Sequence, residues 1–148
     1  MTTIKIFTDG GSRGNPGPAA CAFVVESDSK IIFKNHLYLG KTTNNVAEYS
    51  GLLEAVKWLF INVKKHKVDQ VLFLLDSELI VNQMNKLYKI KNENLKRIYN
   101  DILLILEKLE IKYFFKHIPR INNKRSDFLV NKCLDENKNN FTLRVVHQ

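Results

Sequence analysis

Four acidic side chains lie at positions where structure alone does not favour a charge. Asp9 ends an alternating strand pattern and precedes a glycine-rich turn, and Asp76 ends a continuous apolar run. Glu48 lies in the first turn of a predicted helix, on the face that carries Leu52 and other apolar residues at helical spacing. Asp127 lies at the start of the last predicted helix. We treat these four acids as candidate catalytic and metal-binding residues.

Each acid taken alone has a simpler explanation. Glu48 and Asp127 could complement the dipoles of their helices. Asp76 could belong to a turn that ends a strand, and Asp9 before Gly10 is a common turn pair. These explanations weaken when the four acids are considered together, because carboxylates gathered at one edge of a sheet repel each other unless a cation neutralises them.

A donor set made only of carboxylates indicates a hard, oxygen-seeking cation, for which Mg²⁺ is the natural candidate. The sequence shows no His or Cys spacing of the kind that binds zinc. Two Mg²⁺ ions about 4 Å apart could activate a water, hold a scissile phosphate and stabilise the leaving oxygen. The chemistry that these residues predict is phosphodiester hydrolysis.

The composition is typical of a globular protein with a basic surface. The 148 residues are 45% hydrophobic and carry a formal charge of +8, with an isoelectric point near 9.5. Clustered Lys and Arg attract phosphates, so the charge favours a polyanionic partner, although a lysine-rich surface can also serve solubility alone. We expect one domain over residues 1–148, because a chain of this length can bury a core without disulfides.

Cysteine usage and hydropathy bear on the location of the protein. Cys21 and Cys133 lie far apart among apolar neighbours, which indicates buried thiols in a reducing compartment rather than a disulfide. No secretory leader pattern opens the sequence, and no segment approaches the roughly 20 apolar residues that cross a bilayer. We therefore expect a cytoplasmic protein without membrane contact. No protein partner is evident, and we expect a monomer.

Apolar periodicity predicts an α/β fold with a five-stranded mixed sheet and helices on both faces. The expected strands are an antiparallel set at 4–9, 19–26 and 30–40, then parallel strands at 71–75 and 112–118. We expect a first helix directly after a capping run at 42–45, and further helices at 77–86 and 95–109. A last helix is expected at 126–135, with Ser126 as its cap. The tail at 136–148 contains an apolar segment, 141–146, that we expect to dock as a short extra strand.

Four motifs in this order resemble those of the type I ribonuclease H family. They are TDGGSRGNPGP at 8–18, TNNVAE at 43–48, DS at 76–77 and NKRSD at 123–127. The resemblance covers about residues 1–135 and implies the ribonuclease H-like fold. It implies an endonuclease that hydrolyses the RNA strand of RNA–DNA hybrids and leaves 5′-phosphate and 3′-hydroxyl ends. It also implies that the four acids hold two Mg²⁺ ions, for which Mn²⁺ can substitute.

The resemblance implies contacts to both strands of a hybrid. Gly10, Ser12, Asn15, Asn44 and Asn45 match positions that contact the RNA strand across the minor groove, where 2′-hydroxyls distinguish RNA from DNA. Asn44 could also act as a helix cap. Another set, Lys41 and Thr43, matches a pocket for a DNA phosphate, which Asn92 could join.

Two departures place the chain in the compact subgroup of the family. Many members carry a mobile His in a Gly-rich loop before the last helix, whereas the stretch at 119–125 is short and has none. His117 precedes it inside a predicted strand, where we expect a structural or surface role. The region at 87–95 is too short for the basic, tryptophan-bearing protrusion of some members, and Trp58 is expected to pack instead.

Three alternatives remain open at this point. The first is another nuclease or strand transferase of the same fold, such as an integrase-like or junction-resolving enzyme, because fold does not fix function. The second is a non-catalytic hybrid-binding module, which would be expected to have lost a carboxylate, whereas all four are present. The third is a domain of a larger polymerase polyprotein, although an initiator Met and a complete predicted sheet favour a free-standing protein.

Overall fold

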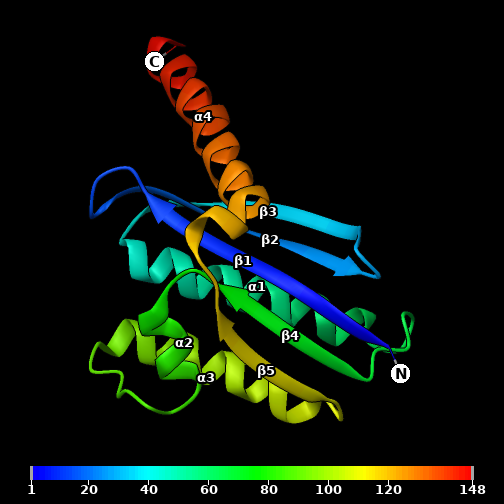
Figure 1. Ribbon diagram of the computed structural model, residues 1–148. Coiled ribbons are helices and arrows are strands. Elements are labelled where there is room, and N and C mark those ends of the chain that lie inside the picture. Colours follow the sequence, from blue (N-terminus) through cyan, green and yellow to red (C-terminus); the bar gives the residue numbers. More distant parts are fainter. Residues whose placement is uncertain (1, 148) are drawn as a thin grey trace.

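The computed structural model describes the backbone of residues 2–147 and the side chains of residues 2–138. Five strands form one mixed sheet in the order β3-β2-β1-β4-β5 (Figure 1). The first three strands are antiparallel, β4 is parallel to β1, and β5 is parallel to β4, which confirms the predicted sheet. The strands are β1 (Thr3–Ser12), β2 (Gly17–Ser27), β3 (Lys30–Thr42), β4 (Gln70–Leu75) and β5 (Lys112–His117).

Helices cover both faces of the sheet, as predicted. They are α1 (Asn44–Asn62), α2 (Glu78–Met84), α3 (Glu93–Lys108) and α4 (Lys124–His147), with a short 3₁₀ turn, η1 (Arg120–Asn123), before α4. α1 packs on β1 and β2 and against α3 on one face, and α4 packs on β1, β2 and β3 on the other. In the described part of the chain no helix is long and apolar enough to cross a membrane.

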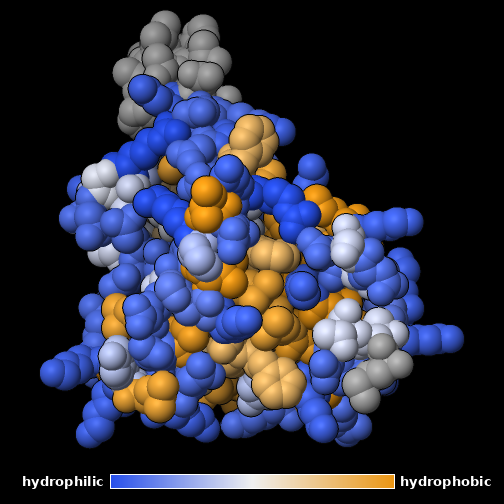
Figure 2. All heavy atoms as spheres, viewed as in Figure 1, coloured by the Kyte–Doolittle hydropathy of each residue, from blue (hydrophilic) through white to orange (hydrophobic). Residues whose placement is uncertain are grey.

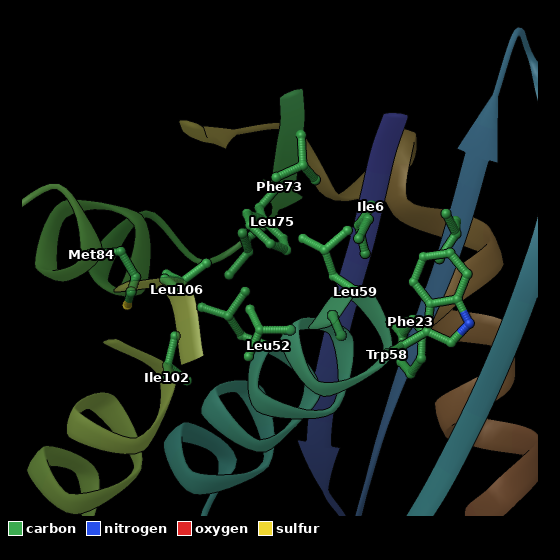
Figure 3. Close-up of a cluster of buried hydrophobic side chains, with 14 of the residues drawn as sticks. Ile6, Phe23, Leu52, Trp58, Leu59, Phe73, Leu75, Met84, Ile102 and Leu106 are labelled. Atoms are coloured by element: carbon green, nitrogen blue, oxygen red, sulfur yellow. The ribbon is translucent and has the colours of Figure 1, made fainter. Parts of the chain in front are cut away.

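The main hydrophobic core lies between the sheet and α1. Figure 3 shows Leu52 and Leu59 of α1 pointing toward Ile6 of β1, Phe73 of β4 and Ile102 of α3. All five side chains are completely buried. Burial of one such side chain stabilises a fold by roughly 1.5–3 kcal/mol. This core fixes β1 and α1, which carry Asp9 and Glu48, and β4, which Asp76 directly follows.

Predictions about three further side chains are confirmed. Trp58 is largely buried, and its ring stacks on Phe33 with centroids 5.5 Å apart and on His66 at 5.8 Å. Cys21 and Cys133 are both free and buried. They therefore pack as small apolar residues.

The opposite face of the sheet has a smaller core. The β2 side chains Ala20 and Ala22 are short, so α4 can pack closely on this strand through Leu129 and Val130. In the described part of the chain α4 covers only the β1, β2 and β3 side of this face. Figure 2 shows apolar side chains gathered in the centre of this view, below α4.

Among the boundaries that differ from the sequence prediction, two affect the segments that carry candidate acids. β1 and β2 remain paired as far as Ser12 and Ala19, so the loop expected at 10–18 is shortened to the residues between Ser12 and Gly17. The last helix begins at Lys124 rather than at 126. Ser126 is therefore inside its first turn and is not its cap.

The expected strand at 141–146 is wrong, because α4 continues as a helix to His147. A strand needs a neighbouring sheet edge to satisfy its backbone hydrogen bonds. The far end of α4 points away from the sheet in Figure 1, so no such edge is beside it. A helix satisfies its backbone within its own segment.

Candidate active site

Two glycines bring the end of β1 into contact with α1. A Cβ at Gly10 would collide with the backbone of Ala47 and lie 2.5 Å from the backbone nitrogen of Glu48. A Cβ at Gly51 would lie 2.6 Å from the carbonyl oxygen of Asp9. Only glycine permits so close a backbone approach. It places Asp9 of β1 beside Glu48 of α1.

The parallel pairing of β1 with β4 adds Asp76. Thr8 and Leu75 are aligned in the ladder, so Asp76 directly follows the last paired residue at the point where Asp9 follows Thr8. Carboxyl ends of parallel strands form the edge of an α/β sheet where ligand sites gather. Ser77 then caps α2 by accepting from the backbone nitrogen of Ile80 at 3.3 Å, which fixes the turn after Asp76.

Two buried side chains attach the start of α4 to β1 and so position Asp127. Asn123 Nδ2 donates to the carbonyl oxygen of Thr8 at 2.8 Å. Ser126 Oγ donates to the carbonyl oxygen of Phe7 at 3.1 Å. Asp127, in the first turn of α4, is thereby held near the end of β1.

The four predicted acids all line one cleft of about 410 Å³. The structure therefore brings together Asp9 of β1, Glu48 of α1, Asp76 from the turn after β4 and Asp127 of α4. The cleft wall also contains Gly10, Gly11, Ser12, Arg13, Asn44, Arg120, Val130, Asn131 and Leu134.

The electrostatics of the cleft are those of crowded, partly buried carboxylates. Burial, with added repulsion from Asp76, Asp127 and Glu48, raises the pKa of Asp9 to about 8 against a hydrogen bond from the Gly10 backbone. Burial also raises the pKa of Glu48 to about 7. A hydrogen bond with Ser77 partly offsets this rise, repulsion from Asp76 adds to it, and the positive charge of Arg120 again offsets part of it. Near neutral pH Asp9 is therefore mostly protonated and Glu48 about half protonated, unless a cation offsets their charge.

The donor chemistry fits a hard divalent cation. Every acidic donor in the cleft is a carboxylate, and a bound cation would offset the burial and repulsion that raise the two pKa values. Within the described residues no three Asp, Glu, His or Cys side chains are close enough together to enclose a metal ion. Mg²⁺ does not need an all-protein cage, because it usually keeps several waters and binds through one or two carboxylates plus substrate phosphates.

Three predicted substrate residues form one hydrogen-bonded group at the rim of the cleft. Asn44 Oδ1 accepts from the backbone nitrogen of Ser12 at 2.9 Å and from its hydroxyl at 3.1 Å. The backbone nitrogen of Asn44 donates to Asn15 Oδ1 at 3.0 Å. The cap of α1 is Thr43, whose hydroxyl accepts from the backbone nitrogen of Val46 at 3.2 Å. The Asn44 side chain thus bonds Ser12 at the end of β1 and does not cap α1.

Other predicted residues lie outside the cleft lining. Lys41, Thr43 and Asn45 are exposed around the start of α1. Asn92 caps α3, its side-chain oxygen accepting from the backbone nitrogens of residues 94 and 95 at 2.9 and 3.1 Å. His117 is exposed at the last position of β5 and does not line the cleft.

Arg120 is the main cleft residue that the sequence interpretation missed. It lies in η1, lines the cleft with the carboxylates and lowers the pKa of Glu48. The short stretch at 119–125 contains three cations, Arg120, Lys124 and Arg125, and nothing in the sequence distinguishes Arg120 from the other two. Asn131 was also missed, although it lies one helical turn after Asp127 and its Nδ2 donates to the Asp127 carbonyl oxygen at 3.0 Å.

Comparisons with known proteins agree on one family. Residues 7–133 match a family model described as reverse transcriptase-like. The ribonuclease H of Wigglesworthia glossinidia brevipalpis is 32% identical over 142 residues, and the match covers 85% of this chain and 84% of that protein. A bifunctional protein of Mycobacterium tuberculosis is 33% identical over 134 residues; the match covers 89% of this chain but 35% of the relative. This chain therefore spans about a third of the length of that relative.

A solved structure is similar over nearly the whole chain. It is LC11-RNase H1, isolated from compost, in complex with an RNA/DNA hybrid. It is 41% identical with a TM-score of 0.85, and the match covers 90% of this chain and 97% of that one. The residues matched by the family model, 7–133, include all four candidate acids.

Proposed function

The chain belongs to the type I ribonuclease H family, and from this premise we propose that it is an endonuclease that hydrolyses the RNA strand of RNA–DNA hybrids. The observation that carries the proposal is the gathering of Asp9, Glu48, Asp76 and Asp127 in one cleft. Carboxylates are the ligands that a hard divalent cation prefers, so the groups of this cleft suit metal-assisted hydrolysis.

We propose that these four carboxylates hold two Mg²⁺ ions, for which Mn²⁺ can substitute. When bound, the ions would supply Lewis acidity and an activated water for cleavage that leaves 5′-phosphate and 3′-hydroxyl ends. Asp9 lies deepest and is coupled electrostatically to the other three acids. It would therefore be the central ligand, with Asp76 the acid that most strongly repels it.

Arg120 gives this acidic cleft a positive group that can face a phosphate. A guanidinium keeps its charge at all working pH values and donates several hydrogen bonds, so it can hold a scissile phosphate but cannot relay a proton. We propose that Arg120 binds the phosphate beside Glu48. It would supply a positive charge where other family members carry the loop His.

The rim group is suited to reading the RNA strand. The Ser12 hydroxyl and the amides of Asn15 and Asn44 are already ordered by their mutual hydrogen bonds. Preordered groups lose less entropy on binding than free ones. We propose that they contact 2′-hydroxyls together with Gly10 and Asn45. The proposed DNA-phosphate contacts are Lys41, Thr43 and Asn92.

The formal charge of +8 supports a polyanionic substrate despite the acidic cleft. We further propose that residues 1–148 act as one monomeric domain in the cytoplasm. The two buried free thiols are consistent with a reducing compartment.

Cleavage of labelled nucleic acids tests the proposal. We expect the protein to cut an RNA–DNA hybrid with Mg²⁺ or Mn²⁺ and to lose activity in EDTA, while duplex DNA stays intact. Cleavage of duplex RNA would show that the proposed minor-groove contacts are sufficient for cleavage without a DNA strand. Cleavage of DNA as fast as hybrid, or none of the hybrid, would reject the proposal and favour another enzyme of the same fold.

A further inference from the structure

One arginine in the loop between β1 and β2 reaches across to α4. Arg13 Nη1 pairs with Asp135 Oδ1 at 2.7 Å. Its Nη2 donates to the backbone carbonyl oxygen and to the side-chain oxygen of Asn131, each at 3.4 Å. A guanidinium can engage acceptors on two turns of a helix at once, because its donors form a rigid planar fork. Arg13 therefore links the loop to a part of α4 that begins 118 positions later in the chain.

The backbone of Arg13 is held in place within the loop. Its nitrogen donates to the carbonyl oxygen of Pro18 at 2.8 Å. Gly17 passes so close to the Arg13 carbonyl group that a Cβ at Gly17 would collide with it. The guanidinium is thus presented to α4 from a fixed support.

Arg13 lies between two members of the rim group. Ser12 and Asn15 both bond Asn44 at the start of α1. These three residues belong to the proposed RNA contact. A movement of Arg13 relative to α4 would therefore move the residues that contact the RNA strand.

The other end of this link lies beside Asp127. Asn131 follows Asp127 by one helical turn, and its Nδ2 donates to the Asp127 carbonyl oxygen at 3.0 Å. Arg13, Asn131 and Asp127 all line the carboxylate cleft. Asn123 and Ser126 attach the start of α4 to β1, whereas Arg13 attaches the next two turns to the loop. Two attachments at different positions along a helix restrict its tilt as well as its location.

The ion pair itself has little effect on stability. The Arg13 side chain is 40% exposed and that of Asp135 is 67% exposed, so water and salt screen their attraction. The location of the pair, between the rim group and a candidate metal ligand, indicates that its main effect is on the geometry of the cleft.

We propose that Arg13 is a positioning residue that, through Asp135 and Asn131, fixes the rim group relative to Asp127. This inference rests on the proposed ribonuclease function. Misplacement of reacting groups by about 1 Å can cost about 100-fold in rate. Loss of the link should therefore slow cleavage of bound hybrid and change its affinity little. Direct binding of an RNA phosphate by Arg13 would have the opposite signature, because Asp135 would then compete with the phosphate.

Cleavage of hybrid in Mg²⁺ by variants of both partners tests the link. Arg13→Ala should lower kcat about 10-fold and Asp135→Ala about 5-fold, with KM changed less than about 2-fold. The double alanine variant should lose about as much as Arg13→Ala alone, because both changes break the same link. Hybrid affinity in EDTA, measured by anisotropy, should stay within about 2-fold of the wild type.

A charge exchange tests whether the two side chains act as a pair. Arg13→Glu alone should lose about 30-fold in kcat, and Arg13→Glu with Asp135→Arg should recover to within about 3-fold of the wild type. The matched control is Lys132→Glu with Glu136→Lys, which exchanges an ion pair contained within α4. It should change kcat less than about 2-fold. Thermal unfolding checks that every variant is folded.

Calorimetric Mg²⁺ titration gives a readout that does not require cleavage. Arg13→Ala should weaken Mg²⁺ binding about 3-fold by displacing Asp127, whereas removal of a positive charge alone would strengthen it. Binding should recover in the variant with Arg13→Glu and Asp135→Arg. If the wild type cut no hybrid, the proposed function would be rejected and the titration would still decide the role of Arg13.

Four results would each overturn the inference. The first two are an unchanged kcat and an unchanged or stronger Mg²⁺ affinity in Arg13→Ala. The third is a charge exchange that restores no activity, or that restores no more than the α4 control loses. The fourth is a raised KM in Arg13→Ala without any loss of rate in Asp135→Ala, which would assign Arg13 to a direct phosphate contact.

Discussion

Asp9 is buried where three other carboxylates converge, so its negative charge is costly without a nearby cation. The rise of its pKa to about 8 has two causes that both belong to the site: burial at the β1 end and repulsion by Asp76, Asp127 and Glu48. A group perturbed in this way in a cleft is a functional candidate on physical grounds. The same perturbation makes the metal-free protein sensitive to pH.

We predict that the stability of the metal-free protein falls with rising pH. Asp9 titrates at 3.8 when unperturbed and at about 8 in the folded chain. The folded state thus holds a proton that the unfolded state releases. This contribution to the free energy of unfolding is complete below about pH 4 and is lost as the pH rises through about 8.

Asp9→Asn should remove much of this pH dependence and raise Tm in EDTA near pH 8 by several degrees, at ~2–4 °C per kcal/mol for a chain of this size. Thermal unfolding followed by circular dichroism at a series of pH values measures the Tm of the wild type and of the variant. An unchanged pH slope in the variant would show that Asp9 does not titrate as described.

Arg120→Ala should slow hybrid cleavage about 100-fold, the order of loss for removing one donor to a developing charge. Arg120→Lys should recover part of the rate, because it restores the charge but not the fork of donors. His117→Ala, at an exposed position outside the cleft, is the control and should change little. Single-turnover kinetics measure the cleavage rate of each variant. A larger loss of rate in His117→Ala than in Arg120→Ala would contradict the proposed role of Arg120.

At the residue scale, acids were easier to predict than their neighbours. Glu48 on an apolar helix face and Asp76 after an apolar run conflict with the local pattern, and that conflict is visible in sequence. Arg120 conflicts with nothing in its short polar stretch. Its place in the cleft depends on how η1 folds back to the sheet, which no local pattern records.

At the scale of elements, the start of α4 is held to β1 by side chains rather than by a cap. Asn123 and Ser126 are both buried and bond consecutive carbonyl oxygens of β1. The sequence interpretation of Ser126 as a cap was wrong because a Ser in a first helical turn and a Ser at a cap look alike. The long-range bond to Phe7, 119 residues away, decides its role.

We predict that Asn123→Ala destabilises the protein by about 1–3 kcal/mol, because it leaves the buried Thr8 carbonyl oxygen without its donor. Ser126→Ala should cost about 1 kcal/mol. Urea denaturation measures both, with Asn35→Ala on exposed β3 as the control. Calorimetric Mg²⁺ titration should also show weaker binding in Asn123→Ala, since Asp127 loses its anchor. Wild-type metal affinity in a destabilised variant would limit Asn123 to a structural role.

The element order and sheet topology were predictable because periodicity and the short connections left few arrangements. The boundaries of β1 and α4 were not. Pairing with β2 extends β1 into a glycine-rich segment whose composition suggests a loop. The tail at 141–146 is apolar enough for a strand, but the direction of α4 takes it away from both sheet edges.

For the whole molecule, the two ends of the sheet differ in chemistry. One end gathers four acids, and the other gathers apolar side chains beside three lysines. A net charge of +8 surrounding an acidic cleft lets the surface attract a nucleic acid while the cleft attracts cations. Both properties follow from charges placed far apart in sequence.

Hybrid binding should therefore weaken steeply with salt. Each neutralised phosphate contributes about −0.9 to the slope of log affinity against log salt concentration for a duplex. We expect a slope of about −3 or steeper, measured by anisotropy with the inactive Asp9→Asn variant. A flat response would mean that the basic surface does not contact the phosphates.

The most direct test of the account is hybrid cleavage in Mg²⁺ by wild type, Asp9→Asn and Asp76→Asn, with hybrid binding measured in parallel. We predict that the wild type cuts the RNA strand, and that each variant loses about 10³-fold in rate, or ~4 kcal/mol of transition-state stabilisation. Both variants should still bind the hybrid. Near wild-type cleavage by either variant would contradict the claim that these carboxylates act together as the catalytic metal site.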